Sequence, residues 1–266
     1  MTGSTLDLRC GDCLELMKDI PSKSIDLILC DPPYGTTPLK WDSILPFDKL
    51  WKEYNRIIKD NGAIVLFANE PFASMLRASN IKKYKYDWYW VKERLTNVFQ
   101  VKRRCGKVVE NICVFYKKQP TYNPQKTAHL GKKVTNKIGL GGFSITQKGK
   151  STIVPLEYTD DGTRHPTQVL NFNRDNPRRR LHPTQKPVAL LEYLINTYTN
   201  KGDTVLDNCM GSGSTGCACI ETERNFIGIE KDKKYFEIAK VRLEEYKEKL
   251  WGKDENCTIR ESNQPS

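Results

Sequence analysis

The sequence lacks the features that direct a protein into a membrane or out of the cell. No apolar run approaches the roughly 18 residues that a membrane-spanning helix needs. The first residues, Met1 to Thr5, show no charged stretch followed by an apolar one, so we expect no signal peptide and a cytoplasmic location. The nine cysteines, an odd number without an export signal, are expected to be free thiols.

Histidine is scarce, which argues against a metal centre. The three histidines, His129, His165 and His182, are far apart in the chain. Cys10 and Cys13 form a Cys-x-x-Cys pair, but no second pair of ligands stands at zinc spacing. The sequence therefore predicts no metal site.

Acidic side chains are in the minority. The chain has 32 Asp and Glu against 43 Lys and Arg, which gives a net charge of +11. Such a surplus favours a polyanionic partner, namely DNA, RNA or an acidic membrane surface. The membrane is the weakest of the three, because no apolar span accompanies the charge.

Two blocks of α/β pattern flank a basic middle segment. In the first block, apolar runs predict strands at residues 25–30 and 63–68, with β-rich runs at 86–91 and 112–116. Helical spacing predicts a helix over 47–59, ended by Asn61-Gly62. The second block predicts helices at 187–195, from Thr215 and at 234–250, and strands at 204–207 and 225–230.

This alternation predicts an α/β fold with a doubly wound, mostly parallel sheet and a basic insertion. We expect the catalytic domain to comprise residues 1–118 and 181–250. Residues 119–180, rich in Pro, Gly, Asn, Thr and Lys, are expected to form an insertion, and residues 251–266 a flexible tail.

A glycine-rich loop indicates where a cofactor binds. Residues 211–216, Gly-Ser-Gly-Ser-Thr-Gly, follow a predicted strand and open a predicted helix, which fits a dinucleotide-binding loop. Asp207 argues against a nicotinamide enzyme, because its carboxylate would repel a pyrophosphate but attract the α-ammonium of S-adenosylmethionine. Glu230, which ends the next strand, can then accept hydrogen bonds from the two ribose hydroxyls.

The turn Asp31-Pro32-Pro33-Tyr34 ends the first predicted strand and suits one kind of chemistry. An exocyclic base amine is a poor nucleophile, because its lone pair is delocalised into the ring. The Asp31 carboxylate and the Pro32 carbonyl can accept its two N–H groups, and the prolines fix their positions. Tyr34 offers a flat face on which an extruded base can stack.

These motifs resemble those of the DNA amino-methyltransferases, in the permuted order called the β group. Asp31-Pro32-Pro33-Tyr34 is similar to the catalytic motif, Gly11-Asp12-Cys13-Leu14 to the segment that meets the cofactor adenine, and residues 182–187, His-Pro-Thr-Gln-Lys-Pro, to the segment that holds the methionine end. The resemblance implies the class I methyltransferase fold, with S-adenosylmethionine as cofactor. It implies a cofactor site of Asp12, Cys13, Asp31, Thr184, Lys186, Asp207, Cys209, Gly211, Ser212, Gly213, Ser214, Thr215, Glu230 and Lys231, with Lys186 on the cofactor carboxylate.

The sequence also departs from the family pattern. The family loop usually reads Asp-Pro-Phe before its glycines, whereas this chain reads Asp207-Asn208-Cys209-Met210. Asp at the head of the catalytic motif is more typical of adenine-N6 enzymes, and Ser of cytosine-N4 enzymes. We therefore expect adenine-N6 methylation of DNA. The alternatives are cytosine-N4 methylation, methylation of an RNA base, and a catalytically inactive DNA-binding protein of this fold.

The basic middle segment lies where this family places its target-recognition region. We expect DNA contacts from Lys102, Arg103, Arg104, Lys132, Lys133, Arg178, Arg179 and Arg180, although any one of these clusters could be a solvated charge run. Trp41, Trp51, Trp88 and Trp90 are expected to be core residues rather than base-stacking ones. The resemblance implies double-stranded DNA as partner, and leaves open a cognate restriction endonuclease and a homodimer.

Overall fold

A computed structural model describes residues 4–36, 42–128, 142–145, 151–154, 162–174, 185–252 and 257–263. The chain divides into two compact units, residues 1–123 with 167–266, and residues 124–166. The smaller unit contains two antiparallel strand pairs, β6 (Thr127–Ala128) with β9 (Thr163–Arg164) and β7 (Gly142–Ile145) with β8 (Ser151–Val154).

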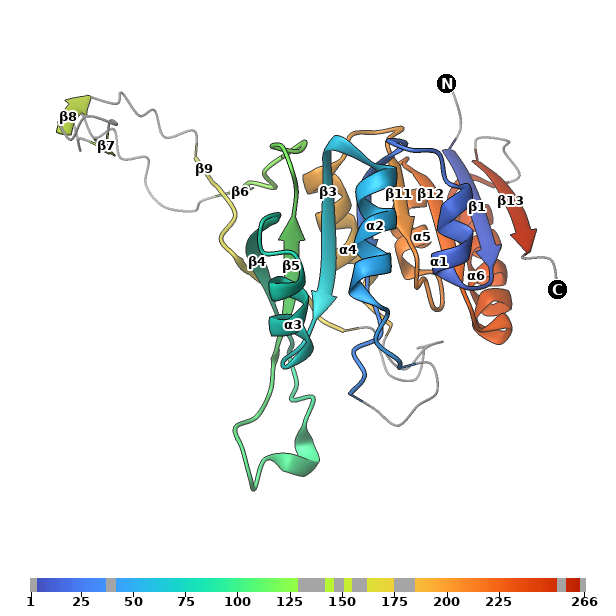
Figure 1. Cartoon of the computed structure of the whole chain (residues 1–266), viewed down its shortest axis with the longest axis horizontal. Coiled ribbons are helices and arrows are strands. Elements are labelled where there is room, and N and C mark those ends of the chain that lie inside the picture. The colour runs from blue at the N-terminus through green and yellow to red at the C-terminus, as the bar shows by residue number, and fades with distance from the viewer. Residues whose placement is uncertain are drawn as a thin grey trace. The chain divides into compact units, whose positions relative to one another are not determined.

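The larger unit is built on a nine-stranded sheet in the order β10-β4-β5-β3-β2-β11-β12-β1-β13 (Figure 1). Every neighbouring pair is parallel, except that β5 runs antiparallel to β3 and β4. The strands are β1 (Ser4–Cys10), β2 (Ile25–Cys30), β3 (Ile58–Ala68), β4 (Tyr84–Val91), β5 (Val109–Phe115), β10 (Val169–Asn171), β11 (Thr204–Asp207), β12 (Asn225–Glu230) and β13 (Cys257–Asn263). The predicted α/β fold with a mostly parallel sheet is confirmed.

Helices cover both faces of the sheet, because the central strands are apolar on both sides. Alternate residues of β2 enter different cores, Leu27 and Leu29 on one face and Ile28 and Cys30 on the other. The first core is closed by α4 (Val188–Tyr198), α5 (Ser214–Glu221) and α6 (Lys233–Trp251). The second is closed by α1 (Cys13–Leu16), α2 (Phe47–Ile57) and α3 (Phe72–Ser79). Short 3-10 turns stand at Met17–Asp19 (η1) and Val98–Gln100 (η2).

The neighbouring strands β2 and β11 mark the point where the chain winds in opposite directions. From β2 the chain passes through α2 to β3 on one side, and from β11 it passes through α5 to β12 on the other. In such sheets a crevice opens beyond the carboxyl ends of the two strands. Asp31 follows β2 and Asp207 ends β11, so both motifs singled out from the sequence meet at this crevice.

The predicted end of the first helix is wrong. Asn61-Gly62 does not stop a helix; it lies inside β3, which begins at Ile58 directly after α2. An irregularity in the β2–β3 register accommodates this stretch. A side chain at Gly62 would meet the carbonyl oxygen of Asp26 at 2.8 Å, so the glycine is needed for close approach of two strands rather than for a turn.

The ends of the chain also differ from expectation. Within the predicted flexible tail, residues 257–263 form β13 and pair in parallel register with β1, a strand that the sequence reading did not identify. The compact smaller unit, residues 124–166, is narrower than the expected insertion of 119–180, and β10 belongs to the main sheet beside β4. Both β13 and β10 form by backbone pairing with a strand at the edge of the sheet. Hydrophobic periodicity in the sequence does not reveal such pairing.

Trp51, Trp88 and Trp90 are buried, as expected, while Trp41 lies outside the described residues. Within the part of the chain that the structure describes, no helix has the length and apolar character to cross a membrane.

Candidate active site

A cavity of about 800 Å³ lies at the carboxyl ends of β2, β11 and β12. Its size suits a small-molecule ligand, since such pockets usually enclose about 300–1,000 Å³. The structure brings together at this cavity all but two of the residues expected to bind cofactor: Asp12, Cys13, Asp31, Lys186, Asp207, Cys209, Gly211, Ser212, Ser214, Thr215, Glu230 and Lys231. Gly213 is not in its lining, and Thr184 lies outside the described residues.

The turn Asp31-Pro32-Pro33-Tyr34 is held in place by Asp42, a residue to which the sequence did not point. Its buried carboxylate accepts the backbone N–H groups of Tyr34 at 2.7 Å, Gly35 at 2.9 Å and Thr36 at 2.9 Å. This fixes the path of the chain directly after the two prolines. Asp31, Pro32, Pro33 and Tyr34 all line the cavity.

One face of the Tyr34 ring packs against another side chain of the protein. It stacks on Phe72, with ring centroids 5.0 Å apart and planes inclined by 27°. Its hydroxyl donates to Asp31 Oδ1 and lies 3.3 Å from Glu110 Oε1. The ring is thus held in one orientation at the cavity wall, next to the carboxylate proposed to meet the amine.

Lys186 lies among carboxylates. Its Nζ is 2.5 Å from Asp31 Oδ2 and 3.0 Å from Glu110 Oε1, and it sits over the Phe67 ring at 4.9 Å. Glu110 is buried on β5 and also pairs with Lys92. Two carboxylates and two ammonium groups therefore alternate from β4 to the catalytic turn. The expectation that Lys186 serves the cofactor carboxylate stays a prediction, because in this structure its ammonium pairs with Asp31.

This arrangement controls the charge of Asp31. Burial raises the pKa of Asp31, the Lys186 ammonium lowers it, and the Glu110 carboxylate raises it again. The pKa of Glu110 is below its usual value despite the opposing effect of burial, because Lys186 and Lys92 stabilise the carboxylate. Lys186 has a raised pKa, since Asp31 and Glu110 outweigh its burial. On balance the pKa of Asp31 is raised by burial, and the Lys186 ammonium is the group that most opposes this rise.

Asp207 is held at the end of β11 by the helix that follows the glycine loop. Its Oδ2 accepts the Thr215 hydroxyl at 2.6 Å, and its Oδ1 accepts the Cys209 backbone N–H at 3.1 Å. Burial raises its pKa to about 6. Gly213 begins α5 with φ of 76°, a conformation that favours glycine, and so places Thr215 behind Asp207.

The glycine loop offers no free anion site at its first residue. The Gly211 N–H, which a dinucleotide fold would present to a pyrophosphate, donates to Glu230 Oε2 at 2.9 Å. The other Glu230 oxygen accepts the Asp232 N–H at 2.8 Å. Asp12 begins α1 by accepting the Leu14 N–H and pairs with Lys231 at 2.9 Å. Asp12, Asp207 and Glu230 make the cavity acidic, which fits a cationic nucleoside better than a phosphate.

Three thiols line the same cavity: Cys13, Cys30 and Cys209. Burial raises the pKa of Cys30 to about 12, so this thiol is neutral at physiological pH. Cys209 stands where related loops carry an aromatic residue, and it interacts with Cys13 and Cys30. Among the described residues no group of His, Cys, Asp or Glu is arranged to hold a metal ion.

Glu110 and Lys92 belong to the ion-pair cluster beside Asp31, and the sequence did not point to either of them. Glu110 stands in β5 and Lys92 directly follows β4, and Glu110 is 76 residues away from its second partner, Lys186. A charged residue beside the apolar run of β5 was the available signal, because buried charges are almost always paired.

The candidate DNA contacts are placed only in part. Lys102, Arg103 and Arg104 are exposed in the loop between β4 and β5. Lys132, Lys133, Arg178, Arg179 and Arg180 lie outside the described residues.

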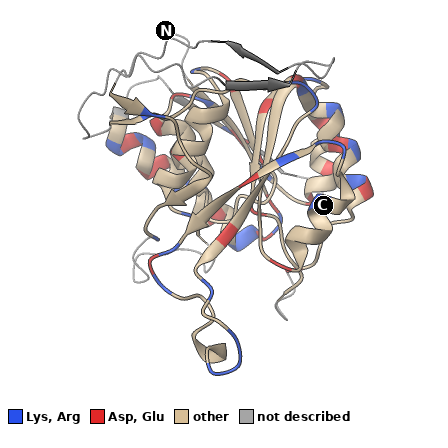
Figure 2. Ribbon diagram, turned by 90° about the vertical axis from the view of Figure 1, so that its left-hand side faces the viewer, with Lys and Arg blue, Asp and Glu red and all other residues tan. Residues whose placement is uncertain are grey.

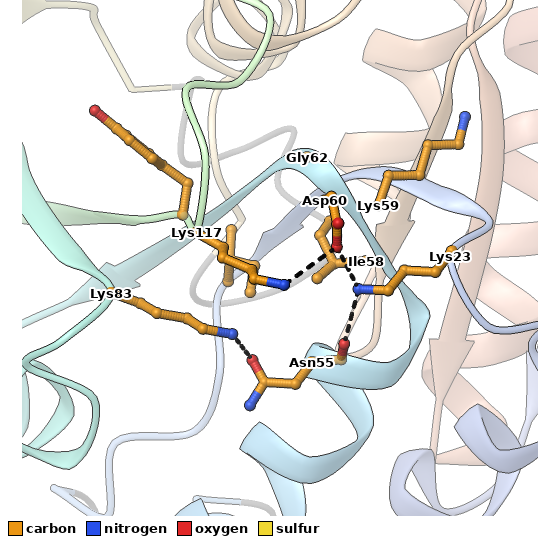
Figure 3. Close-up of a pocket in the computed structure, with 10 residues that line it drawn as sticks. Lys23, Asn55, Ile58, Lys59, Asp60, Gly62, Lys83 and Lys117 are labelled. Carbon is orange, nitrogen blue, oxygen red and sulfur yellow. Dashed lines mark hydrogen bonds and ion pairs between the residues drawn. The ribbon is translucent and has the colours of Figure 1, made fainter.

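A second, much smaller cavity lies at the opposite edge of the sheet, near the start of β3 (Figure 3). Several lysines surround it, but Lys23 pairs with Asp60 at 2.9 Å and Lys117 with the same carboxylate at 3.7 Å. Its volume of about 20 Å³ holds little more than one water molecule. We read it as a structural ion-pair cluster.

Comparison with known proteins gives the family. A model of the DNA methylase family matches residues 25–241. The chain belongs to the N6-adenine and N4-cytosine DNA methyltransferases. This methyltransferase is 30% identical over 252 residues to "Type II methyltransferase M.HpaI" of Haemophilus parainfluenzae, covering 89% of this chain and 74% of the relative. It is also 30% identical over 259 residues to "DNA adenine methyltransferase YhdJ" of Escherichia coli (strain K12), covering 88% of this chain and 81% of the relative.

Solved structures agree with this assignment. The methyltransferase is 29% identical to the protein in the crystal structure of the M1.HpyAVI–SAM complex, with a TM-score of 0.59 over 90% of this chain and 100% of that chain. PvuII DNA methyltransferase, described as cytosine-N4-specific, shares the fold, with a TM-score of 0.64 and 18% identity over 97% of this chain and 95% of that chain. The enzyme depends on S-adenosylmethionine, and the cavity lined by Asp207 and Glu230 has a size and charge that suit such a cofactor.

Proposed function

We propose that this methyltransferase transfers a methyl group to adenine N6 in double-stranded DNA after extruding the base. The observation that carries the proposal is the Asp31 carboxylate at the cavity wall, between the Tyr34 hydroxyl and the Lys186 ammonium. An aspartate here accepts an N–H of the target amine directly. The relative described as a DNA adenine methyltransferase supports the choice of adenine.

The chain's own residues supply binding, orientation and proton acceptance. When bound, the cofactor supplies a methyl group on a positively charged sulfur. Asp207 is suited to the cofactor's ammonium and Glu230 to its ribose hydroxyls. On the substrate side, Asp31 and the Pro32 carbonyl accept the two amine N–H groups, and the proton released on methylation passes to Asp31. Tyr34 presents its free face to the base.

Pre-positioned acceptors lower the barrier because no reorganisation is needed when charge develops on the amine. Asp42 holds the turn, Phe72 holds the Tyr34 ring, and Lys186 lowers the pKa of Asp31 against the effect of burial. These contacts support a site built around the amine rather than around a covalent intermediate.

The test is to methylate unmodified genomic DNA with the purified enzyme, digest it to nucleosides and weigh them. N6-methyladenine is the expected product. Detection of N4-methylcytosine instead would show that the target base is cytosine and would contradict the proposal. Asp31→Ala is expected to lose methyl transfer while binding S-adenosylmethionine as the wild type does. Retained activity in that variant would remove Asp31 from the mechanism.

We further propose that the basic segment 119–180 selects the DNA sequence, because it carries Lys and Arg with few opposing acids. We also propose a cytoplasmic location, where DNA would be available to the enzyme. A cognate restriction endonuclease and a homodimer remain hypotheses for co-purification and sedimentation experiments.

A further inference from the structure

The loop between β4 and β5 leaves the sheet at the catalytic edge. β3 and β4 both pair antiparallel with β5, so they run in the same direction and end at the same edge. That edge also carries Asp31 and Asp207 at the ends of β2 and β11. Figure 1 shows the loop projecting well beyond the sheet there. We call residues 94–108 the hairpin tip.

The hairpin tip is held by its own hydrogen bonds. Asn97 Nδ2 donates to the Cys105 carbonyl at 2.9 Å, and Asn97 Oδ1 accepts the Lys107 N–H at 2.6 Å. The Thr96 N–H donates to the Lys107 carbonyl at 2.9 Å. The side chain of Asn97 therefore bridges the two sides of the loop, and these bonds give the tip a defined shape.

The most exposed large apolar side chain among the described residues lies on this tip. Phe99 is 102% exposed, and its neighbours Val98 and Val101 are 58% and 44% exposed. An isolated exposed apolar residue is ordinary, but a cluster at the end of a projection is typical of an interaction site. The fold gains nothing from holding Phe99 in water.

The charges around Phe99 have one sign. The tip contains Arg94, Lys102, Arg103, Arg104 and Lys107 and no Asp or Glu. Figure 2 shows the basic stretch at its end. Double-stranded DNA matches both properties, because it has an anionic exterior and an apolar stacked interior. A second copy of the enzyme matches only the apolar part, since two such tips would repel each other.

We propose that the hairpin tip inserts Phe99 into the DNA duplex beside the target base, while Lys102, Arg103 and Arg104 bind the flanking phosphates. Extruding a base leaves a gap in the stack, and an aromatic ring fills such a gap at little cost. The base of the hairpin is linked to the catalytic turn, because Lys92 pairs with Glu110, which pairs with Lys186 beside Asp31. This proposal deepens the proposed function and rests on it for the identity of the target base.

The first test compares Phe99→Ala with Ile81→Ala, an exposed apolar residue at the opposite edge of the sheet. The substrate is an unmethylated duplex that contains the site the enzyme modifies. It is either fully paired or has an abasic nucleotide opposite the target base. Phe99→Ala is expected to lower kcat/KM on the paired duplex by about ten- to a hundredfold, the range given by stacking one base on an aromatic ring. On the abasic duplex it is expected to recover, because that base is already unpaired. Unchanged kcat/KM, or equal loss on both duplexes, overturns the proposal.

The second test does not depend on methyl transfer. In Phe99→Trp the new indole is expected to lose fluorescence on binding a mixed-sequence duplex, measured against the wild type and Ile81→Trp. If no base is methylated but the indole is quenched, the proposed function fails and the hairpin proposal stands. If bases are methylated and the indole is not quenched, the hairpin proposal fails alone. If Phe99→Ala changes the sedimentation of the enzyme but not its kcat/KM on DNA, the tip binds a second copy of the enzyme. That outcome also overturns the hairpin proposal.

Discussion

Two substitutions beside Asp31 are expected to move the pH dependence of methyl transfer in opposite directions. Methyl transfer needs Asp31 ionised, so the acidic limb of the rate profile follows its pKa. Lys186→Met removes the ammonium that lowers this pKa, and the limb moves to higher pH. Glu110→Gln removes the carboxylate that raises it, and the limb moves to lower pH.

The sizes follow from the distances. A unit charge at about 4 Å contributes about 4 kcal/mol at an effective dielectric constant near 20, or about three pKa units. Lys186, 2.5 Å from Asp31 Oδ2, is therefore expected to shift the limb by about two to three units. Glu110 binds the same ammonium, so its carboxylate lies within about 6 Å of that of Asp31. At that distance Coulomb's law with the same dielectric constant gives a shift of the limb by about two pH units.

The assay is the single-turnover rate with saturating DNA and S-adenosylmethionine between pH 5 and 10. Lys186→Met is expected to be slow at pH 7 and to recover at high pH, and Lys186→Arg to keep the wild-type limb. Each deletion leaves a buried charge unpaired at a cost of about 3–5 kcal/mol, so thermal melting is recorded alongside. A purely structural role would lower the rate at every pH. Shifts in the same direction, or none, would refute the electrostatic account.

Three further outcomes are expected. Asp207 has a pKa of about 6, and a cationic ligand favours its ionised form, so calorimetry should show S-adenosylmethionine binding tighten as the pH rises through 6, with this dependence absent in Asp207→Asn. Replacing Lys102, Arg103 and Arg104 together by Ala should reduce the slope of log K against log salt by about 3 in DNA titrations, whereas Lys82→Ala should leave it unchanged. Gly62→Ala should cost about 1–3 kcal/mol in urea unfolding because its Cβ meets a backbone carbonyl at 2.8 Å, and equal stability would contradict the close approach.

The part of the site that lies at strand ends could be predicted from the sequence. Three apolar runs in the sequence stop at Asp31, Asp207 and Glu230. Each run predicts a strand and, at the same time, places an acidic residue at the end of that strand. The doubly wound topology then brings these ends to one crevice. Nothing beyond periodicity and motif order was needed for that step.

The contacts made across the sheet could not be predicted in the same way. Glu110 is a charged residue near the start of β5, and its partners Lys92 and Lys186 lie just after β4 and just before α4. β13 is polar and depends on an edge already built by β1. Both depend on which segments become neighbours, which local pattern does not encode.

The smaller unit, residues 124–166, joins the catalytic body at two fixed points. At its start, Asn123 donates its backbone N–H to Thr197 at 2.8 Å and its amide to Thr199 at 3.0 Å. At its end, the Gln168 carbonyl accepts the Tyr89 N–H at 2.8 Å as the chain enters β10. Both anchoring contacts are made within the larger unit. We therefore expect changes of length and composition between these two anchors to leave the fold around Asp31 unaffected.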